Sequence, residues 1–228
     1  MTVESEFPQL IRTSAGKRGP TQDEERRLRA AGFVRVAGID EVGRGPIAGP
    51  VVAGAVVLPD LEGFEHVDLH LIRDSKTLSA LQLQRANALV REIALCAAVG
   101  ECTSGEIDTL GIAPATRQAM RRALNGLPDA PTHLLIDAFP LDWNLVPCTS
   151  IIKGDALCTA ISAASIIAKV YRDGIMEQME VAHPGYGFAS HKGYASAIHL
   201  QAVARLGPSP IHRKSFSPFK PKLFDLNA

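Results

Sequence analysis

Residues 36–46 read Val-Ala-Gly-Ile-Asp-Glu-Val-Gly-Arg-Gly-Pro, an apolar run that leads into two acids and a glycine-rich turn. The small and β-branched residues before the acids predict a buried strand over 33–39. Asp40 and Glu41 follow that strand directly, and Gly43-Arg44-Gly45 follows the acids. Ligand sites in open α/β sheets lie at the carboxyl ends of strands, so this stretch predicts both a sheet and a site at its edge.

Two other predicted strands are also followed by an acid. Asp137 comes directly after a strand predicted over 133–136, and Asp155 follows a strand predicted over 149–152. We therefore expect Asp40, Asp137 and Asp155 to converge at one edge of the sheet. Asp155 also stands where it could cap a long helix predicted over 156–180, and a cap role need not exclude a role in the site.

Glu41 raises a question of strand parity. Successive side chains of a strand point to opposite faces, so Asp40 and Glu41 can serve one site only if the strand ends or bulges there. Alternatively, Glu41 contributes its backbone carbonyl, or one of the two acids faces water.

The remaining pattern predicts one α/β domain over 21–228, preceded by a flexible extension over 1–20. Capping-box sequences at 21–24 and 79–82 mark the starts of two helices. We expect helices over 21–31, 79–98, 116–124, 156–180 and 195–206, strands over 33–39, 51–58, 99–103, 133–136 and 149–152, and loops over 60–75 and 208–218.

Composition excludes several classes of protein. Hydrophobic residues make up 46% and charged residues 21% of 228 residues, which argues against a disordered chain. The longest apolar run, 46–59, is too short to span a bilayer, and the start lacks a signal-peptide pattern. The four cysteines form no C-x-x-C pair. We expect free thiols in a cytoplasmic protein.

Charge is balanced overall but uneven along the chain. Residues 1–182 hold 18 Lys and Arg against 23 Asp and Glu, whereas residues 183–228 hold 6 against 1. A basic C-terminal region indicates either contact with a polyanion or only a solvated face. Its stretches His191-Lys192-Gly193-Tyr194 and Ile211-His212-Arg213-Lys214-Ser215-Phe216 mix cations with aromatic residues, as nucleic-acid grooves do.

Hard oxygen ligands without His or Cys suit Mg²⁺ or Mn²⁺. Two carboxylates about 4 Å apart repel by roughly 4 kcal/mol at an effective dielectric near 20, so clustered acids favour a bound cation. Gly43, Arg44 and Gly45 would let backbone N–H groups and a guanidinium approach phosphate, and Lys76 would add a charge. A plain tight turn and a surface lysine are the alternative interpretations. The glycine spacing does not match a dinucleotide fingerprint.

Together these stretches resemble bacterial ribonuclease HII. The similarity spans about residues 34–219 in the order of the family, and residues 1–20 lie outside it. The stretches that carry it are 36–46, 74–76 (Asp-Ser-Lys), 135–137 (Leu-Ile-Asp), 153–155 (Lys-Gly-Asp), 161–169 (Ile-Ser-Ala-Ala-Ser-Ile-Ile-Ala-Lys), 191–194 and 212–216.

The resemblance implies a ribonuclease H-like mixed β-sheet flanked by helices, with a helical C-terminal part. It implies an endoribonuclease that cleaves RNA in RNA–DNA hybrids and incises duplex DNA 5′ to an embedded ribonucleotide. Two metal ions would act, leaving 3′-OH and 5′-phosphate ends. The implied metal site is Asp40, Glu41, Asp137 and Asp155.

For substrate contacts, the resemblance implies that Gly43, Arg44 and Gly45 sense the ribose 2′-OH and that Tyr194 reads the junction. We expect Lys76, Lys192 and Arg213 to contact phosphates. We also expect a monomer without membrane contact. Three alternatives remain: a ribonuclease HIII, which carries an additional N-terminal substrate-binding domain; a non-catalytic nucleic-acid-binding module; and a DNA exonuclease or recombinase on the same fold.

Overall fold

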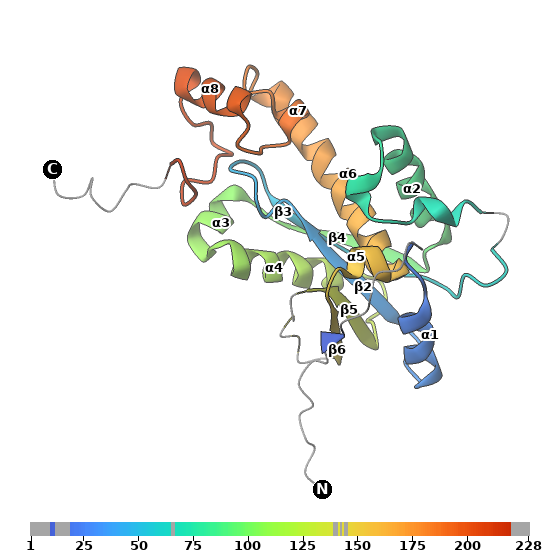
Figure 1. Ribbon diagram of the computed structural model, residues 1–228. Coiled ribbons are helices and arrows are strands. Elements are labelled where there is room, and N and C mark those ends of the chain that lie inside the picture. Colours follow the sequence, from blue (N-terminus) through green and yellow to red (C-terminus); the bar gives the residue numbers. More distant parts are fainter. Residues whose placement is uncertain are drawn as a thin grey trace, which may run out of the picture.

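The computed structural model describes residues 10–11, 19–64, 67–138, 141, 143 and 146–219. Their centre is a six-stranded mixed sheet with the order β1-β6-β5-β2-β3-β4 (Figure 1). Strands β2, β3 and β4 pair antiparallel, while β5, β6 and β1 continue the sheet in parallel from β2. The strands are β1 (Leu10–Ile11), β2 (Val36–Val42), β3 (Val51–Val57), β4 (Cys96–Cys102), β5 (His133–Asp137) and β6 (Cys148–Ile151).

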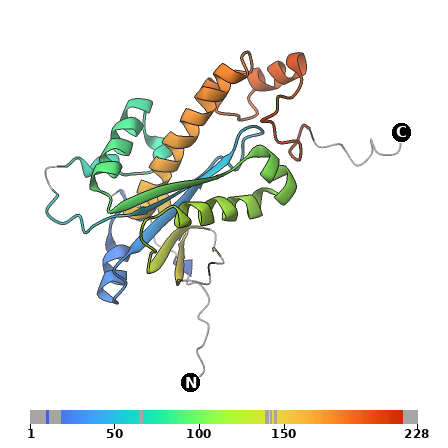
Figure 2. The ribbon, with the colours of Figure 1, turned by 180° about the vertical axis from the view of Figure 1, so that it is seen from behind.

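Helices cover both faces of the sheet, which explains why β3 is apolar throughout. On one face lie α2 (Ala80–Ile93) and α6 (Thr159–Ala182), and on the other lie α3 (Ser104–Leu110) and α4 (Ile112–Asn125), as Figures 1 and 2 show. Alternate strand residues serve the two cores. Val36 and Val56 pack on the α6 side, whereas Ala37 and Ala55 pack on the α4 side.

The long helix α6 lies directly on the backbone of the sheet. A Cβ at Gly38 or Gly54 would collide with the main chain of Ala160 or Ala164. The small residues Ala160 and Ala164 of α6 allow this close packing. This contact places the α6 side chains next to Asp40, which follows Gly38 in β2 and faces the same side.

A smaller C-terminal unit packs at the far end of α6. It contains α7 (Phe188–His191) and α8 (Ala197–Leu206), which Figure 1 shows beyond the sheet. Its core combines Tyr186, Phe188 and Ala202 with Met176 of α6 and Ala48 of the segment before β3. The segment between β2 and β3 is therefore packed against the C-terminal unit.

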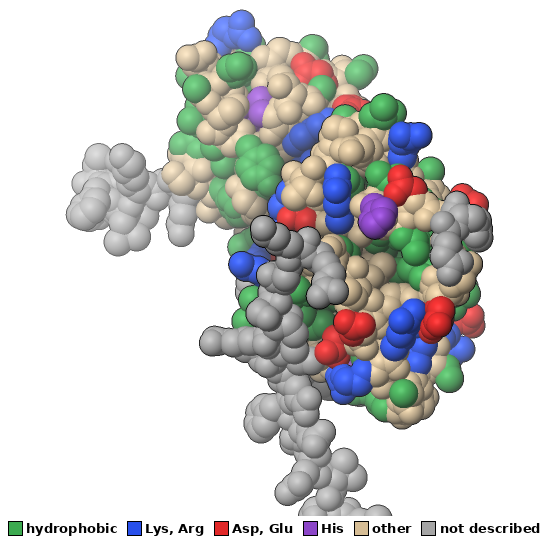
Figure 3. Space-filling model, turned by 45° about the vertical axis from the view of Figure 1, so that its right-hand side comes forward, with side chains coloured by type: hydrophobic (Ala, Val, Ile, Leu, Met, Phe, Trp, Pro, Cys, Tyr) green, Lys and Arg blue, Asp and Glu red, His purple; other side chains and the backbone are tan. Residues whose placement is uncertain are grey.

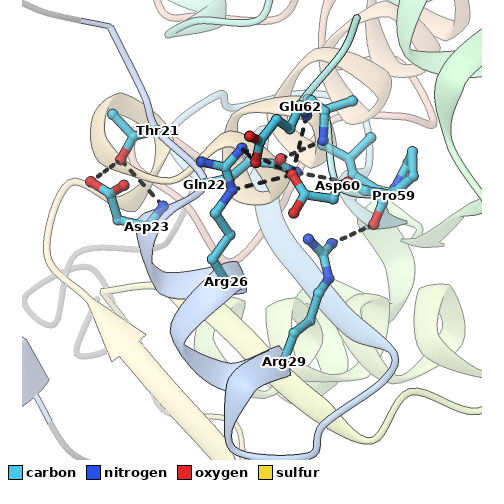
Figure 4. A network of polar contacts seen from close by, with 10 residues as sticks. Thr21, Gln22, Asp23, Arg26, Arg29, Pro59, Asp60 and Glu62 are labelled. Carbon is cyan, nitrogen blue, oxygen red and sulfur yellow. Dashed lines mark hydrogen bonds and ion pairs between the residues drawn. The ribbon is translucent and has the colours of Figure 1, made fainter.

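Helix α1 (Asp23–Ala30) is tied to the end of β3 by polar contacts (Figure 4). Gln22 donates to the Pro59 carbonyl at 2.9 Å, and Arg26 forms an ion pair with Asp60 at 2.9 Å. The predicted capping box at 21–24 is wrong. Gln22 occupies the N-cap position without a side-chain cap bond, because the backbone of Thr21 pairs with Leu157 and Thr159 instead.

Several predicted boundaries shift. The capping box of Ser79 and Gln82 is confirmed, but α2 ends at Ile93 because the chain turns there to enter β4. The helix expected over 116–124 is α4, which already starts at Ile112. Helices α3 and α7 were not predicted. The long C-terminal helix is broken at Cys158 into α5 (Gly154–Leu157) and α6. The expected extension over 1–20 contributes β1, and most of it lies outside the described residues.

The four cysteines are free, and Cys102 and Cys158 are buried. In the described part of the chain, no helix is long and apolar enough to cross a membrane.

Candidate active site

Three carboxylates converge at one edge of the sheet, as the strand pattern predicts. Asp40 lies in β2, Asp137 ends β5 and Asp155 lies in the first turn of α5. One oxygen from each lies within 4.8 Å of the others, and we call these three residues the acidic cluster. Asp40 and Asp155 are buried, and Asp137 is half-buried. The mixed sheet produces this meeting because β2 and β5 run parallel as neighbours.

Neighbouring donors orient each member of the acidic cluster. Asp40 accepts a hydrogen bond from the Glu41 amide at 2.8 Å, and Asp137 accepts one from the Gly154 amide at 2.8 Å. Lys76 donates to Asp155 at 2.8 Å. The alternative role of Asp155 as a cap of the long helix is wrong, because the N-cap of α6 is Cys158.

Burial makes the cluster costly in its fully charged form. It raises the pKa of Asp40 well above its ordinary value, and the charges of Glu41 and Asp137 add to this effect. Burial also raises the pKa of Asp137, against the Gly154 hydrogen bond. Two unit charges 4.8 Å apart repel by about 3.5 kcal/mol at an effective dielectric near 20. The arrangement therefore favours a cation.

Strand parity separates Glu41 from the acidic cluster. Strand β2 continues to Val42 instead of ending at Ile39, so Asp40 faces α6 and Glu41 faces the opposite side. One oxygen of Glu41 pairs with the Arg44 guanidinium at 3.1 Å, and the other, Oε2, is buried with no hydrogen-bond partner among the described residues. The structure does not bring the Glu41 side chain together with the other three acids, and its assignment as a metal ligand stays a prediction.

The Gly43-Arg44-Gly45 turn lies directly after Glu41 and next to Tyr194. A Cβ at Gly45 would lie 3.5 Å from Cε1 of the Tyr194 ring, although the two residues are far apart in the sequence. The Tyr194 side chain is 52% exposed, so it is not a core tyrosine. Gly45, which is exposed, and the aromatic ring thus form one accessible surface, whereas Gly43 is buried.

The role expected of Arg213 needs correction. Its guanidinium is buried and donates to the carbonyls of Gly43, Arg44 and Gly49, so it supports the turn and presents no surface charge to a phosphate. The Lys192 ammonium also has a protein partner, since it pairs with Glu177 at 2.7 Å.

Figure 3 shows Lys and Arg side chains interleaved with Asp and Glu on the face it presents. The uneven charge of the sequence therefore does not translate into one uniformly basic face there.

Two site residues were not singled out from the sequence. Ser165 of α6 hydrogen-bonds Asp40 and also lies 3.0 Å from the Ser75 hydroxyl. Arg172, farther along α6, is buried against the segment that follows the turn. A basic residue on the buried face of an apolar helix was the available signal for Arg172. Lys169 and Asp173 of α6 form an ion pair at 2.6 Å.

Similarity to known proteins shows the family to which the chain belongs. The ribonuclease HII family model matches residues 37–218, which include the acidic cluster, the turn and Tyr194. The chain belongs to the ribonuclease HII family. The ribonuclease HII of Dehalococcoides mccartyi strain BAV1 is 44% identical over 201 residues, covering 88% of this chain and 94% of that protein. The ribonuclease HII of Paracidovorax citrulli is 51% identical over 183 residues, covering 80% and 74%.

A solved structure agrees with this assignment. Ribonuclease H2 from Pyrococcus horikoshii superposes with a TM-score of 0.68 at 27% identity, covering 82% of this chain and 95% of that one. The ribonuclease H-like fold is thereby confirmed, and the chain is a ribonuclease H hydrolase of type HII. Ribonuclease HII membership supports endoribonuclease activity on RNA–DNA hybrids.

Proposed function

We propose that this ribonuclease HII also incises duplex DNA 5′ to a single embedded ribonucleotide, leaving 3′-OH and 5′-phosphate ends. The observation that carries the proposal is the juxtaposition of the acidic cluster with the turn at 43–45, which begins three residues after Asp40 in the chain. A nuclease centre and a candidate ribose-recognition element then share one edge of the molecule.

The acidic cluster fits a divalent cation of the Mg²⁺ or Mn²⁺ kind. It offers carboxylate oxygens alone, the donors that these hard ions prefer. Burial also raises the pKa of the Asp40 carboxyl, and a bound cation would stabilise its charged form. Asp40, Asp137 and Asp155 would hold the metal, with Glu41 contributing through its side chain or its backbone carbonyl. When bound as a pair, such ions activate a water and stabilise the leaving 3′-oxygen of an in-line displacement.

The protein's own residues would align the substrate. Lys76 stands 2.8 Å from Asp155, with 73% of its side chain exposed, so it can contact a phosphate without leaving the site. Only the 2′-OH, a donor and an acceptor, distinguishes RNA from DNA at a single nucleotide. Backbone groups of the turn at 43–45 and the hydroxyl of Tyr194 would contact that sugar, and the closeness of Gly45 to the Tyr194 ring supports this.

A purely binding role is disfavoured by the same cluster. Three carboxylates without a cation would repel the phosphates that such a module must attract. We further propose that the protein acts as a monomer in the cytoplasm, in the repair of ribonucleotides within DNA, and that residues 21–228 form its catalytic domain.

Digestion of end-labelled duplexes tests the proposal. The substrates are an RNA–DNA hybrid, a DNA duplex with one ribonucleotide and an all-DNA duplex, each with and without Mg²⁺. We expect metal-dependent cleavage of the first two and a cut mapped 5′ to the ribonucleotide. Cleavage of the hybrid alone would reject the incision activity, and cleavage of the all-DNA duplex would indicate a DNA nuclease instead.

A further inference from the structure

Two buried arginines surround the segment that links β2 to β3. Arg213 donates from Nε to Gly49, from Nη1 to Arg44 and from Nη2 to Gly43, at 2.9, 3.0 and 2.6 Å. All three acceptors are main-chain carbonyls, and two of them belong to the turn at 43–45. The buried guanidinium therefore fixes the backbone of the turn from its interior side.

Arg172 connects the same segment to the loop that carries Tyr194. Its Nε and Nη2 donate to the carbonyls of Pro50 and Ala48, at 2.9 and 3.2 Å. Its Nη1 donates to the carbonyl of Lys192, two residues before Tyr194, at 3.0 Å. One side chain on α6 thus links the segment that follows the turn to the loop that carries Tyr194.

The backbone repeats this connection. The Ile47 amide donates to the Gly193 carbonyl at 2.9 Å, and the Arg213 amide donates to the Ile47 carbonyl at 2.8 Å. Gly43 has a φ of +91°, and the space that its Cβ would need is filled by the Arg172 side chain. The turn, the Tyr194 loop and the segment at 211–213 therefore form one hydrogen-bonded unit.

Burying two guanidinium groups costs free energy, and a role in positioning the backbone explains why both are present. The two guanidinium groups are 1% and 0% exposed, and burial lowers the pKa of both, that of Arg213 to about 9. Apolar residues of similar volume often stabilise a core as well as a buried charge does. Only the planar fork of arginine can direct several N–H groups to carbonyls that diverge in one plane.

We propose that Arg172 and Arg213 are positioning residues for substrate selection, which hold the turn at 43–45 and Tyr194 at the separation that a ribonucleotide junction requires. This inference rests on the proposed function. Neither guanidinium bonds to the acidic cluster, so their loss would affect the choice of substrate more than metal binding.

Arg172→Lys and Arg213→Lys test the inference, because lysine keeps the charge but concentrates its donors at one point. The readout is the ratio of the cleavage rate on a duplex with one ribonucleotide to the rate on a long hybrid. We expect this ratio to fall by about tenfold, the effect of losing one charge-assisted hydrogen bond that fixes a contact. Mn²⁺ affinity, measured by calorimetry without nucleic acid, should stay unchanged.

Arg122→Lys is the matched control. Arg122 of α4 also donates to a main-chain carbonyl, that of Glu101 at 2.6 Å, and pairs with Glu106, but it lies on the opposite face of the sheet. We expect a loss of thermal stability with an unchanged ratio of cleavage rates.

Duplex binding in EDTA adds a readout that is independent of cleavage. The two positioning variants should no longer distinguish a ribonucleotide-containing duplex from an all-DNA duplex.

A milder variant keeps the test decisive if the lysine variants fail to fold. Asp108 of α3 accepts hydrogen bonds from the amides of Lys214 and Ser215, at 2.9 and 2.8 Å, and so anchors the segment that carries Arg213. Asp108→Ala should lower the ratio in the same direction by a smaller factor. An unchanged ratio, with both rates falling in step with melting temperature, would overturn the inference. A wild-type protein that cleaves only the hybrid, or neither substrate, would reject the proposed function instead.

Discussion

The Nε2 atoms of His199 and His212 lie 3.0 Å apart inside the C-terminal unit. Nδ1 of His199 donates to the Tyr194 carbonyl, and Nδ1 of His212 accepts from the Ser209 amide, both within 2.8 Å. With these partners, Nε2 of His212 carries a proton and Nε2 of His199 does not. The His212 Nε2–H therefore donates a hydrogen bond to Nε2 of His199. The pair is neutral, and it holds the backbone of Tyr194 in place.

The histidine pair predicts a loss of stability in acid. Burial, followed by the charge of His199, lowers the pKa of His212 to about 4, and burial also lowers the pKa of His199. Between about pH 4 and the ordinary histidine value of 6.5, the unfolded chain binds more protons, so stability rises with pH and levels off above that range. At pH 5, His212 alone should cost roughly 2 kcal/mol of the free energy of unfolding.

Urea unfolding at several pH values would measure that loss, and histidine NMR would assign it. We expect the His212 ring carbons not to titrate above pH 5 in the folded protein, but to titrate normally in the urea-unfolded chain. Titration near 6.5 in the folded state would contradict a neutral buried pair.

Neutralising a member of the acidic cluster should separate activity from stability. Asp40→Asn and Asp137→Asn remove a metal ligand, so we expect about a thousandfold loss of cleavage rate, equivalent to several kcal/mol of transition-state stabilisation. Both variants should unfold at higher urea in metal-free buffer, because like-charge repulsion falls. Asp60→Asn is the control, since Asp60 pairs with Arg26 (Figure 4) and is not a member of the acidic cluster. Near-normal turnover of either cluster variant at saturating Mg²⁺ would exclude the proposed metal site.

Glu41→Gln should be milder than Asp40→Asn if Glu41 uses its backbone carbonyl. The Glu41 side chain faces Arg44 and lies outside the acidic cluster, so the substitution leaves the three clustered carboxylates in place. We expect Mn²⁺ affinity close to that of the wild type, measured by calorimetry on both variants side by side. A loss as large as that of Asp40→Asn would show that the Glu41 carboxylate moves onto the metal.

Lys76→Ala should weaken binding to all duplexes alike. Its exposed ammonium beside Asp155 is placed to neutralise one phosphate, so the slope of log affinity against log salt should fall by about 0.9. Fluorescence anisotropy over a salt series measures the slope. Arg26→Ala should leave the slope unchanged, since Arg26 pairs with Asp60 and Glu62 and with no member of the acidic cluster. The same slope in wild type and Lys76→Ala would mean that Lys76 serves only Asp155.

Tyr194 offers an aromatic face and one polar tip, and the two can be tested separately. Tyr194→Phe loses one hydrogen bond, worth about 0.5–1.5 kcal/mol, or roughly a two- to tenfold loss of rate. Tyr194→Ala should be clearly worse, and worse on a single ribonucleotide than on a long hybrid. Since the side chain is 52% exposed, the melting temperature should change little. Equal losses on both substrates with a destabilised fold would reject a junction-reading role.

The acidic cluster could be predicted because it depends on strand ends. An aliphatic run followed by Asp137 already specifies which edge of the sheet the carboxylate reaches, since parallel strands share that edge. Glu41 could not be placed in the same way. Whether it joins Asp40 depends on where β2 ends, and pairing with β3 extends that strand to Val42.

The sequence by itself determined the local chemistry: the buried strands, the acids that follow them, the glycine turn and the family that these stretches resemble. Only the tertiary structure decided what Arg172, Arg213 and Ser165 do. Their roles arise from contacts between segments far apart in the chain, such as the contact between Arg213 and Gly43. An arginine's sequence neighbours do not reveal whether its guanidinium meets water, a phosphate or buried carbonyls, because that depends on which backbone groups folding leaves without partners.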